Sequence, residues 1–199
     1  MKFLLFSDLH CDEDAARQLV ARARHADVVI GAGDFGNVRR GVEICIRILQ
    51  AIAKPAVLVP GNNETDEELR QACRAWPTAQ VLHGSGTMID GVPFFGIGGG
   101  IPITPFGDWS FDFSEEDATR MLAPCPAGAV LVAHSPPLGT LDQSSRGGNL
   151  GSTAIRDAIL RVRPRLVVCG HIHASGGKQA DLDGIPVINA GPLGMEWEV

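Results

Sequence analysis

Five short apolar runs in this chain are each followed at once by residues that can bind a metal ion. Short apolar runs of this kind are consistent with buried strands, and ligand sites in open α/β sheets form outside the carboxyl ends of the strands. We therefore expect a fold in which five strand ends present these residues to one point in space. The segments are Asp8-Leu9-His10, Gly33-Asp34, Gly61-Asn62-Asn63-Glu64, Ala133-His134-Ser135 and Gly170-His171-Ile172-His173.

The first half of the chain alternates strand and helix patterns. Its helical segments have apolar residues at three- and four-residue spacing, and Thr65 with Glu68 has the spacing of a capping box. This alternation predicts a parallel sheet with right-handed crossovers. The expected strands span residues 2–6, 27–30, 56–59 and 81–82, and the expected helices span 12–25, 38–53 and 65–76.

The second half adds hairpins to this pattern. Asp90-Gly91 and Asp183-Gly184 each join two apolar runs, which is a strong short-range hairpin signal. No linker or repeat divides the chain, so we expect one domain over residues 1–199, an α/β fold of two packed sheets with helices outside. The expected strands span 87–90, 92–97, 130–133, 166–169, 178–182 and 185–189, and the expected helices span 114–122 and 152–162.

Composition and charge narrow the class of protein. The 199 residues carry a net charge of −6 without a Lys/Arg cluster, so we expect no extended nucleic-acid partner. No run approaches the roughly 20 apolar residues of a membrane span, and Asp8 interrupts the N-terminal apolar run too early for a signal peptide. The five cysteines show no CxxC spacing, which disfavours a disulfide framework. These features predict a protein of the reducing cytoplasm with no membrane partner.

The residue types at the strand ends indicate which metals they suit. Asp, His and Asn together favour first-row divalent ions such as Mn, Fe, Zn or Ni, whereas an all-carboxylate set favours Mg or Ca. An aspartate can bridge two cations roughly 3.5–4 Å apart, and such a pair clamps a phosphate ester and lowers the pKa of a bridging water. Four of the six histidines lie in the five segments. The other two, His25 and His83, are predicted to be surface or loop residues.

The order of these motifs resembles the calcineurin-like metallophosphoesterase superfamily. The match runs from residue 1 to about residue 192 and includes Asn189-Ala190-Gly191-Pro192, which is similar to the closing strand and turn of small bacterial members. The resemblance implies a four-layer αββα sandwich of two mixed sheets with flanking helices. It also implies two divalent metal ions, with a metal-bridging hydroxide as the attacking group. The implied ligands are Asp8, His10 and His173 for one ion, Asn62, His134 and His171 for the other, and Asp34 as the bridge between them.

Position 63 departs from the family pattern. Many members have His between the Asn and the acidic residue, where it is taken to protonate the leaving group or to stabilise the transition state. This chain has Asn63, whose amide cannot donate a proton at neutral pH but can hydrogen-bond a phosphoryl oxygen. Losing a general acid typically costs about 10²–10⁴ in rate, and the loss matters less for a good leaving group. Asn63 is therefore a candidate catalytic residue or, alternatively, a structural residue without substrate contact.

We predict a dinuclear-metal phosphodiesterase that acts on a small phosphate ester. Some small bacterial phosphodiesterases of the superfamily also lack the His at this position. The alternatives are a phosphomonoesterase, including a phosphoprotein phosphatase, and a catalytically weak metal-binding module. The presence of all seven implied ligands disfavours the catalytically weak metal-binding module.

Two loops contain residues that could contact the substrate. Arg146, in the Gly-rich loop after His134, is the favoured substrate-binding candidate because a guanidinium matches phosphate bidentately. Ser135 and Asn149 are further candidates, and a merely solvated loop is the alternative. The aromatic residues of 101–113 have three interpretations: a stacking platform, a buried cluster, or a contact between copies in a homo-oligomer.

Overall fold

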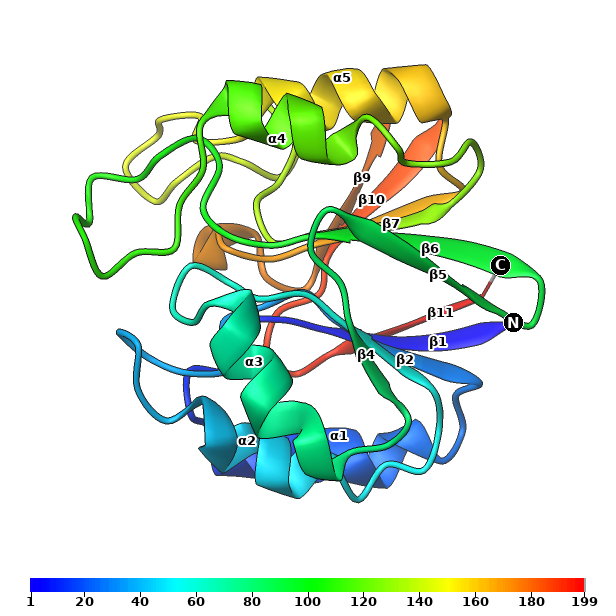
Figure 1. Ribbon diagram of the computed structural model, residues 1–199. Helices are drawn as coiled ribbons and strands as arrows, with labels where there is room; N and C mark the ends of the chain where they lie inside the picture. Colours follow the sequence, from blue (N-terminus) through cyan, green and yellow to red (C-terminus); the bar gives the residue numbers. More distant parts are fainter. Residues whose placement is uncertain (199) are drawn as a thin grey trace.

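The first half of the chain forms most of a five-stranded sheet (Figure 1). The structure is a computed structural model and describes residues 1–198. The elements of this sheet and its helices are β1 (Lys2–Phe6), α1 (Glu13–Ala23), β2 (Val28–Gly31), α2 (Val42–Leu49), β3 (Ala56–Leu58), α3 (Asp66–Ala72), the 3₁₀ turn η1 (Cys73–Ala75), β4 (Ala79–Val81) and β11 (Met195–Glu198). The strand order is β11-β1-β2-β3-β4, in which β1 to β4 run parallel and β11 runs antiparallel to β1.

The second half of the chain forms a six-stranded sheet. Its elements are β5 (Ser85–Ile89), β6 (Val92–Ile97), α4 (Glu115–Leu122), β7 (Val130–Ala133), α5 (Thr153–Val162), β8 (Leu166–Cys169), the 3₁₀ turn η2 (His173–Ser175), β9 (Lys178–Leu182) and β10 (Ile185–Asn189). The strand order is β5-β6-β7-β8-β10-β9. The four inner strands run parallel and the two edge strands run antiparallel to their neighbours, so both sheets are mixed.

Helices cover the outer face of each sheet, and the inner faces pack on each other. In β1, Leu4 and Phe6 belong to the apolar cluster on the side of α1, α2 and α3. Phe3 and Leu5 belong to the cluster between the sheets, where the Phe3 ring meets Phe94 of β6 edge to face with the ring centroids 5.8 Å apart. A third cluster fills the space between the second sheet, α4 and α5. This order of layers confirms the predicted αββα sandwich (Figure 1).

Local sequence signals set several element ends as predicted. Thr65 caps α3 through a capping box: its hydroxyl accepts the Glu68 N–H at 3.2 Å, and the Glu68 carboxylate accepts the Thr65 N–H at 2.8 Å. The helix expected over residues 152–162 begins as expected, and the Ser152 hydroxyl caps α5 by accepting the Ile155 N–H at 3.1 Å. Asp90 and Gly91 have φ of 48° and 77°. Two consecutive positive φ values are required by the turn that joins a tight hairpin, and β5 and β6 pair there as expected.

The helix expected over residues 38–53 is too long at both ends, because only α2, which ends at Leu49, is helical in that range. Val38, Arg39 and Gly41 have left-handed backbone, with φ of 47°, 60° and 75°, which a right-handed helix excludes. The Val38 N–H donates to the side-chain oxygen of Asn63 at 2.8 Å, and the Arg39 N–H donates to the main-chain oxygen of Asn63 at 2.9 Å. Contacts with a distant segment therefore override the helical pattern here.

The edge strand β11 is absent from the prediction. Met195 and Trp197 are half-buried and alternate with exposed Glu residues, which is the period-two pattern of a half-buried strand. The strand pairs along β1, so the two ends of the described chain lie side by side (Figure 1).

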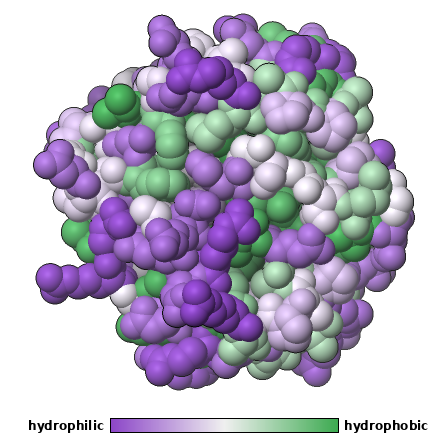
Figure 2. Space-filling model, viewed as in Figure 1, coloured by the Kyte–Doolittle hydropathy of each residue, from purple (hydrophilic) through white to green (hydrophobic). Residues whose placement is uncertain are grey.

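The surface is mixed in polarity. Figure 2 shows hydrophilic residues interspersed with smaller hydrophobic areas on one face of the molecule. Within residues 1–198, no helix is long and apolar enough to cross a membrane. All five cysteines are free thiols, and four of them are buried.

Candidate metal centre

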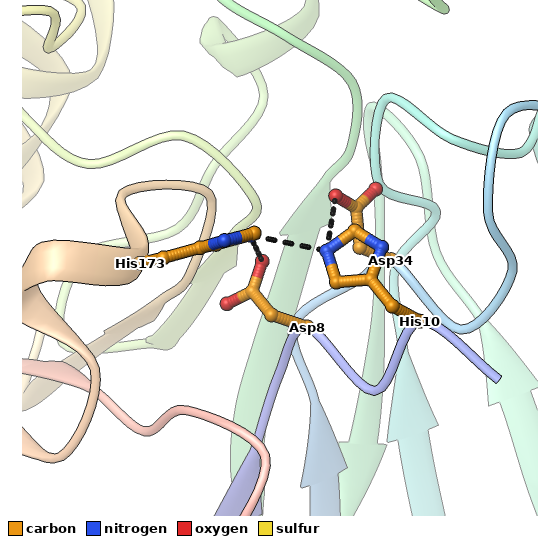
Figure 3. Close-up of side chains that lie close together, drawn as sticks. All are labelled: Asp8, His10, Asp34 and His173. Atoms are coloured by element: carbon orange, nitrogen blue, oxygen red, sulfur yellow. Dashed lines mark hydrogen bonds and ion pairs between the residues drawn. The ribbon is translucent and has the colours of Figure 1, made fainter. Parts of the chain in front are cut away.

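The loops after β1 and β2 and the segment after β8 bring four ligand-type side chains together (Figure 3). One ligand atom from each of Asp8, His10, Asp34 and His173 lies within 4.8 Å of all the others. The Nε2 atoms of His10 and His173 are 3.0 Å apart. Asp34 Oδ2 lies 3.5 Å from His10 Nε2, and Asp8 Oδ1 lies 3.7 Å from His173 Nε2. In Figure 3, Asp8 and His10 come from one loop, and their side chains meet those of Asp34 and His173 from two other segments of the chain.

A second group surrounds the other carboxylate oxygen of Asp34. Asp34 Oδ1 lies 3.5 Å from His134 Nε2. The same nitrogen is 3.3 Å from Asn62 Oδ1, which in turn lies 3.1 Å from His171 Nδ1. The structure therefore brings together all seven residues that were predicted as ligands. They form two adjoining groups, and Asp34 directs one oxygen toward each.

The chemistry of these donor atoms fits divalent metal ions. His134 Nδ1 lies 2.7 Å from the carbonyl oxygen of Ala32, so the neutral ring donates its proton there and its Nε2 keeps a lone pair. That lone pair faces oxygens of Asp34 and Asn62, an arrangement that is repulsive unless a proton or a cation lies between them. Metal ions bind such atoms at about 2.0–2.2 Å. Separations of 3.0 to 3.7 Å between the atoms are consistent with neighbouring ligands of one ion.

The backbone is strained at four of the seven predicted ligands. Asp8, His10, Asp34 and His171 have φ of 57°, 44°, 59° and 65°, which costs an L residue roughly 1–2 kcal/mol. Main-chain hydrogen bonds between the loops after β1 and β2 hold this conformation. The Asp8 N–H donates to the carbonyl oxygen of Gly33 at 2.9 Å, and the His10 N–H donates to the carbonyl oxygen of Asp34 at 3.0 Å. Strain of this kind clusters at functional sites, where the surrounding structure over-determines it.

Charges in the centre shift the pKa values of its groups. Burial alone would raise the pKa of Asp34, but His134 and other donors hold this pKa well below its usual range. Burial alone would lower the pKa of His134, but the carboxylates of Asp34 and Asp8 raise it to about 9. Burial and the neighbouring His134 lower the pKa of His171 to about 4. Without a cation, His134 therefore carries the proton that balances Asp34, and a metal ion would take that place.

Glu64 joins the two loops that carry Asp34 and Asn62. Its buried carboxylate accepts the N–H groups of Asp34 at 2.9 Å, Gly36 at 3.0 Å and Gly61 at 2.7 Å. Burial and the charge of Asp34 raise the pKa of Glu64 to about 7, while the main-chain donors act in the opposite direction. In the sequence, Glu64 is recognisable only as part of a motif. Its three bonds go to main-chain groups, so its observed task is to fix both loops.

Asn63 bonds directly to the shared carboxylate. Its Nδ2 donates to Asp34 Oδ2 at 2.7 Å, its main-chain N–H donates to Asp34 Oδ1 at 2.9 Å, and its Oδ1 accepts the Val38 N–H at 2.8 Å. Asn63 is buried, and it lines the pocket described below. These contacts give Asn63 a positioning role for Asp34. Its contact with substrate stays a prediction.

Asn189 fixes the segment that carries His171. Its Nδ2 donates to the carbonyl oxygens of Gly170 at 3.0 Å and of Ile172 at 3.1 Å, on either side of the histidine. The His171 N–H donates to Asp8 Oδ1 at 2.9 Å. Asn189 stands in the closing motif of the sequence, but only the fold reveals what its amide holds.

A pocket of about 310 Å³ opens over the metal centre. Five of the seven predicted ligands line it, and Phe106, Trp109 and Leu150 form its apolar wall. The Phe106 and Trp109 rings are stacked, with centroids 5.5 Å apart and planes at 19°. The five lining ligands are His10, Asp34, Asn62, His171 and His173.

The other two aromatic residues of this loop have a different environment. Phe111 and Phe113 pack against each other and against the half-buried His83, with ring centroids 4.8 to 5.4 Å apart. The Nδ1 atom of His83 accepts the Gly98 N–H at 3.1 Å. The aromatic loop thus supplies both a pocket wall and a half-buried cluster, and His83 belongs to the latter.

The three residues predicted to contact substrate do not line the pocket. Arg146 is exposed and is outside the set of residues that line the pocket, as is the exposed Asn149. The buried Ser135 hydroxyl accepts the Ile101 N–H at 2.8 Å and donates to the Gly99 carbonyl at 3.2 Å, so it holds the loop rather than facing the pocket. A substrate role for Arg146 stays a prediction. His25 is exposed, as expected.

Comparison with known proteins identifies the family. The family model described as "Calcineurin-like phosphoesterase superfamily domain" matches residues 1–198. The chain belongs to this superfamily. Its members are metal-dependent phosphoesterases, in agreement with the donor set of the centre described above.

Curated relatives match this chain over part of their own length. The chain is 28% identical over 172 residues to a "Probable rhamnogalacturonate lyase C" of Emericella nidulans, a match that covers 77% of this chain and 16% of the relative. It is 29% identical over 176 residues to a UPF0046 protein of Caenorhabditis elegans, which covers 76% of this chain and 58% of the relative. The chain thus spans less than two thirds of the length of these relatives.

Solved structures share the fold of this chain. A protein of Thermus thermophilus superposes with a TM-score of 0.77 at 21% identity, over 96% of this chain and 89% of the other. A dimetal phosphatase from Danio rerio gives 0.64 at 14% identity, over 97% and 88%. A structure described as a novel archaeal phosphodiesterase gives 0.57 at 16% identity, over 96% and 84%. At these identities the likeness concerns the fold alone.

Proposed function

We propose that this phosphoesterase hydrolyses a small phosphodiester with the help of two divalent metal ions. The observation that carries the proposal is the position of Asp34. Its Oδ2 lies 3.5 Å from His10 and its Oδ1 lies 3.5 Å from His134, so one carboxylate serves two separate ligand groups. A carboxylate shared in this way is suited to hold two cations side by side.

In this proposal each group of ligands holds one ion, and the metals are drawn from Mn, Fe, Zn and Ni. Asp8, His10 and His173 hold the first, Asn62, His134 and His171 hold the second, and Asp34 belongs to both. The ions supply Lewis acidity, which neutralises phosphate charge and makes water more acidic. Asp8 and Asp34 offset the charge of the ions, and Asn63 keeps both oxygens of Asp34 in place. The His173 side chain is 64% exposed, so the substrate enters on its side.

Position 63 supports a diester rather than a monoester as the substrate. Both ends of the Asn63 amide are bonded to protein groups, and an amide has no proton to give at neutral pH. Among the described residues that line the pocket, every titratable side chain belongs to the proposed ligand groups. Departure of the leaving group therefore depends on its own acidity. A diester also brings one negative charge fewer into a pocket lined by few donors.

The test measures metal content and hydrolysis together in the wild type and in Asp34→Asn. The substrates are a bis-aryl phosphate and a mono-aryl phosphate. We expect about two ions per chain, faster hydrolysis of the diester, and loss of both properties in Asp34→Asn. The matched control is Asp157→Asn, which changes an exposed carboxylate on α5 and should leave both properties unchanged.

The other outcomes assign the protein differently. Two ions with faster hydrolysis of the monoester would make it a phosphomonoesterase. Two ions without turnover of either ester would favour the metal-binding module. A chain that binds no metal would refute the proposal.

We also propose that the protein works in the cytoplasm. All five cysteines are free thiols, which suits a reducing compartment. Cell fractionation with an antibody to the protein tests this directly.

A further inference from the structure

We propose that the pocket beside the metal centre binds a flat, uncharged ring of the substrate, either an aryl group or a nucleobase, against Phe106 and Trp109. The inference rests on the proposed function, because the ring is placed relative to a phosphate held at the metal centre. It names the class of diester that the site accepts. Nothing in the sequence motifs of the superfamily specifies this part of the substrate.

The first support is the position of large apolar side chains. Phe106 is 51% exposed and Leu150 is 50% exposed, and both line the pocket together with Trp109. Apolar side chains of this size are normally buried, and an exposed group of them beside polar residues marks a ligand surface. The stacked Phe106 and Trp109 rings present π faces, on which every base or aryl ring can stack.

The second support is the charge of the lining. Among the described residues that line the pocket there is no Lys or Arg, and Asp34 is the one carboxylate. The nearby Arg39, which donates to the Trp109 carbonyl at 3.5 Å, is held by both oxygens of Glu68 at 2.8 and 2.9 Å. A second phosphate on the substrate would lie here without a counter-charge. An uncharged ring needs none.

The third support is the anchoring of the loop. The Phe111 N–H donates to the main-chain oxygen of Asn62 at 2.9 Å, and Arg39 holds the carbonyl of Trp109. The rings are therefore tied to a residue of the metal centre, and their distance from the phosphate is fixed before the substrate binds. Preorganisation of this kind raises affinity because little is lost on ordering the loop.

The experiment compares phosphonates, which hold the metal centre without being hydrolysed. We measure binding of phenylphosphonate and methylphosphonate to the metal-loaded protein by calorimetry and by tryptophan fluorescence. Stacking of one ring should make phenylphosphonate bind about tenfold more tightly and quench Trp109. Phe106→Ala and Trp109→Leu should bring the two affinities close together by weakening only phenylphosphonate. Ile103→Ala is the matched control, because Ile103 is 66% exposed in the same loop but does not line the pocket.

A second pair of probes separates the two kinds of ring. A nucleoside 5′-phosphonate is compared with the same sugar phosphonate lacking the base. Two ratios of affinity are compared: that of the nucleoside phosphonate to the base-free sugar phosphonate, and that of phenylphosphonate to methylphosphonate. If the first ratio is larger, the ring is a nucleobase. If the second ratio is larger, the ring is an aryl group. Equal binding of phenyl- and methylphosphonate, together with no effect of the base, overturns the inference. The proposed function fails on a different result, namely metal content and hydrolysis that do not depend on Asp34.

A separate set of hydrogen bonds carries a second inference, that Ser110 and Asp112 are positioning residues for Asn62. Asn62 Nδ2 donates to Ser110 Oγ at 3.0 Å, and Ser110 Oγ donates to Asp112 Oδ1 at 2.7 Å. A hydroxyl has one proton, and a carboxylate can only accept. Once that proton goes to Asp112, the Ser110 oxygen can only accept from the Asn62 amide.

This order of donors decides which way the Asn62 amide faces. Its NH₂ group must point to Ser110, so its oxygen points to His134 and His171. Asp112 is itself fixed, because its Oδ2 accepts the Thr104 N–H at 2.8 Å and the Thr104 hydroxyl at 2.6 Å. The chain of bonds thus presents an oxygen, the atom that binds a cation, to the second ligand group. Like the first inference, it rests on the proposed metal site.

The test measures the affinity of each metal site by calorimetric titration with Mn²⁺. Removing an outer partner of a ligand typically lowers metal affinity about 10–100-fold. We expect Ser110→Ala to do so at one site and to leave the other unchanged, and Ser110→Thr to restore wild-type binding. Asp112→Asn, which can donate to Ser110 and so release its proton toward Asn62, should behave like Ser110→Ala. The inference would be overturned if Ser110→Ala and Asp112→Asn bound metal with wild-type affinity, or if they lost affinity equally at both sites.

Discussion

The main chain at Gly61 lies so close to Asp34 that there is no room for a methyl group. A Cβ at this position would stand 2.0 Å from Asp34 Oδ1 and 2.2 Å from Asp34 N, whereas ordinary contact begins at 3.4 Å. In Gly61→Ala, Asp34 and the main chain at residue 61 must therefore move apart by more than 1 Å. A shift of that size is large compared with the tolerance of a hydrogen bond.

The magnitude follows from the bonds that hold Asp34. Asn63 donates to its carboxylate twice, at 2.9 Å from the main chain and at 2.7 Å from the side chain. Hydrogen bonds to charged groups contribute about 1.5–3 kcal/mol each. Loss of both lowers the free energy of unfolding by about 3–6 kcal/mol. Because Asp34 directs one oxygen toward each ligand group, we also expect Gly61→Ala to weaken metal binding at both sites.

Urea denaturation in the presence of a chelator measures the loss of stability without a contribution from bound metal. Metal titration then measures the second effect. The control is Gly148→Ala, because a Cβ there has its nearest neighbour at 3.8 Å, in ordinary van der Waals contact. If Gly61→Ala unfolds at the urea concentration of the wild type and binds metal with unchanged affinity, the close approach of the two loops is not what places Asp34.

Three other perturbations probe the site and its surroundings. Asn63→His tests the missing general acid: if Asn63 stands in for it, the gain in rate should be larger for poor leaving groups than for good ones, and equal effects would remove that explanation. Burial lowers the pKa of His83 below 6.5 in the folded protein. As the pH drops below 6.5, the unfolded chain therefore takes up a proton at His83 more readily than the folded protein does, and the free energy of unfolding should fall. His83→Gln, which can still accept the Gly98 N–H, should lose part of this pH dependence in urea titrations at several pH values. Free metal at 100 times its dissociation constant should stabilise the wild type by about 2.7 kcal/mol, and thermal unfolding with and without chelator should show a much smaller gain for Asp34→Asn.

Two features of the fold show why local patterns were sufficient in some places and not in others. The turn at Asp90-Gly91 depends on the φ values of two neighbouring residues, so the dipeptide alone predicts the hairpin. The start of α2 depends instead on Asn63, a distant residue that takes the N–H groups of Val38 and Arg39. Apolar spacing carries no information about such a partner. The tasks of Glu64 and Ser110 were missed for the same reason.

The sequence by itself determined the order of strands and helices apart from β11, because that order depends on periodicity. Residue type at strand ends predicted where the ligand-type residues gather, and the resemblance to the superfamily implied the αββα sandwich and the set of seven ligands. The tertiary structure alone decided how those residues meet. His10 and His173 are 163 positions apart, yet their Nε2 atoms lie 3.0 Å from each other. It also decided that Asn63 holds Asp34 and that Phe106 and Trp109 face the pocket while Phe111 and Phe113 do not. The physical reason is that contacts between distant segments arise only when both sheets have packed and their loops share one edge.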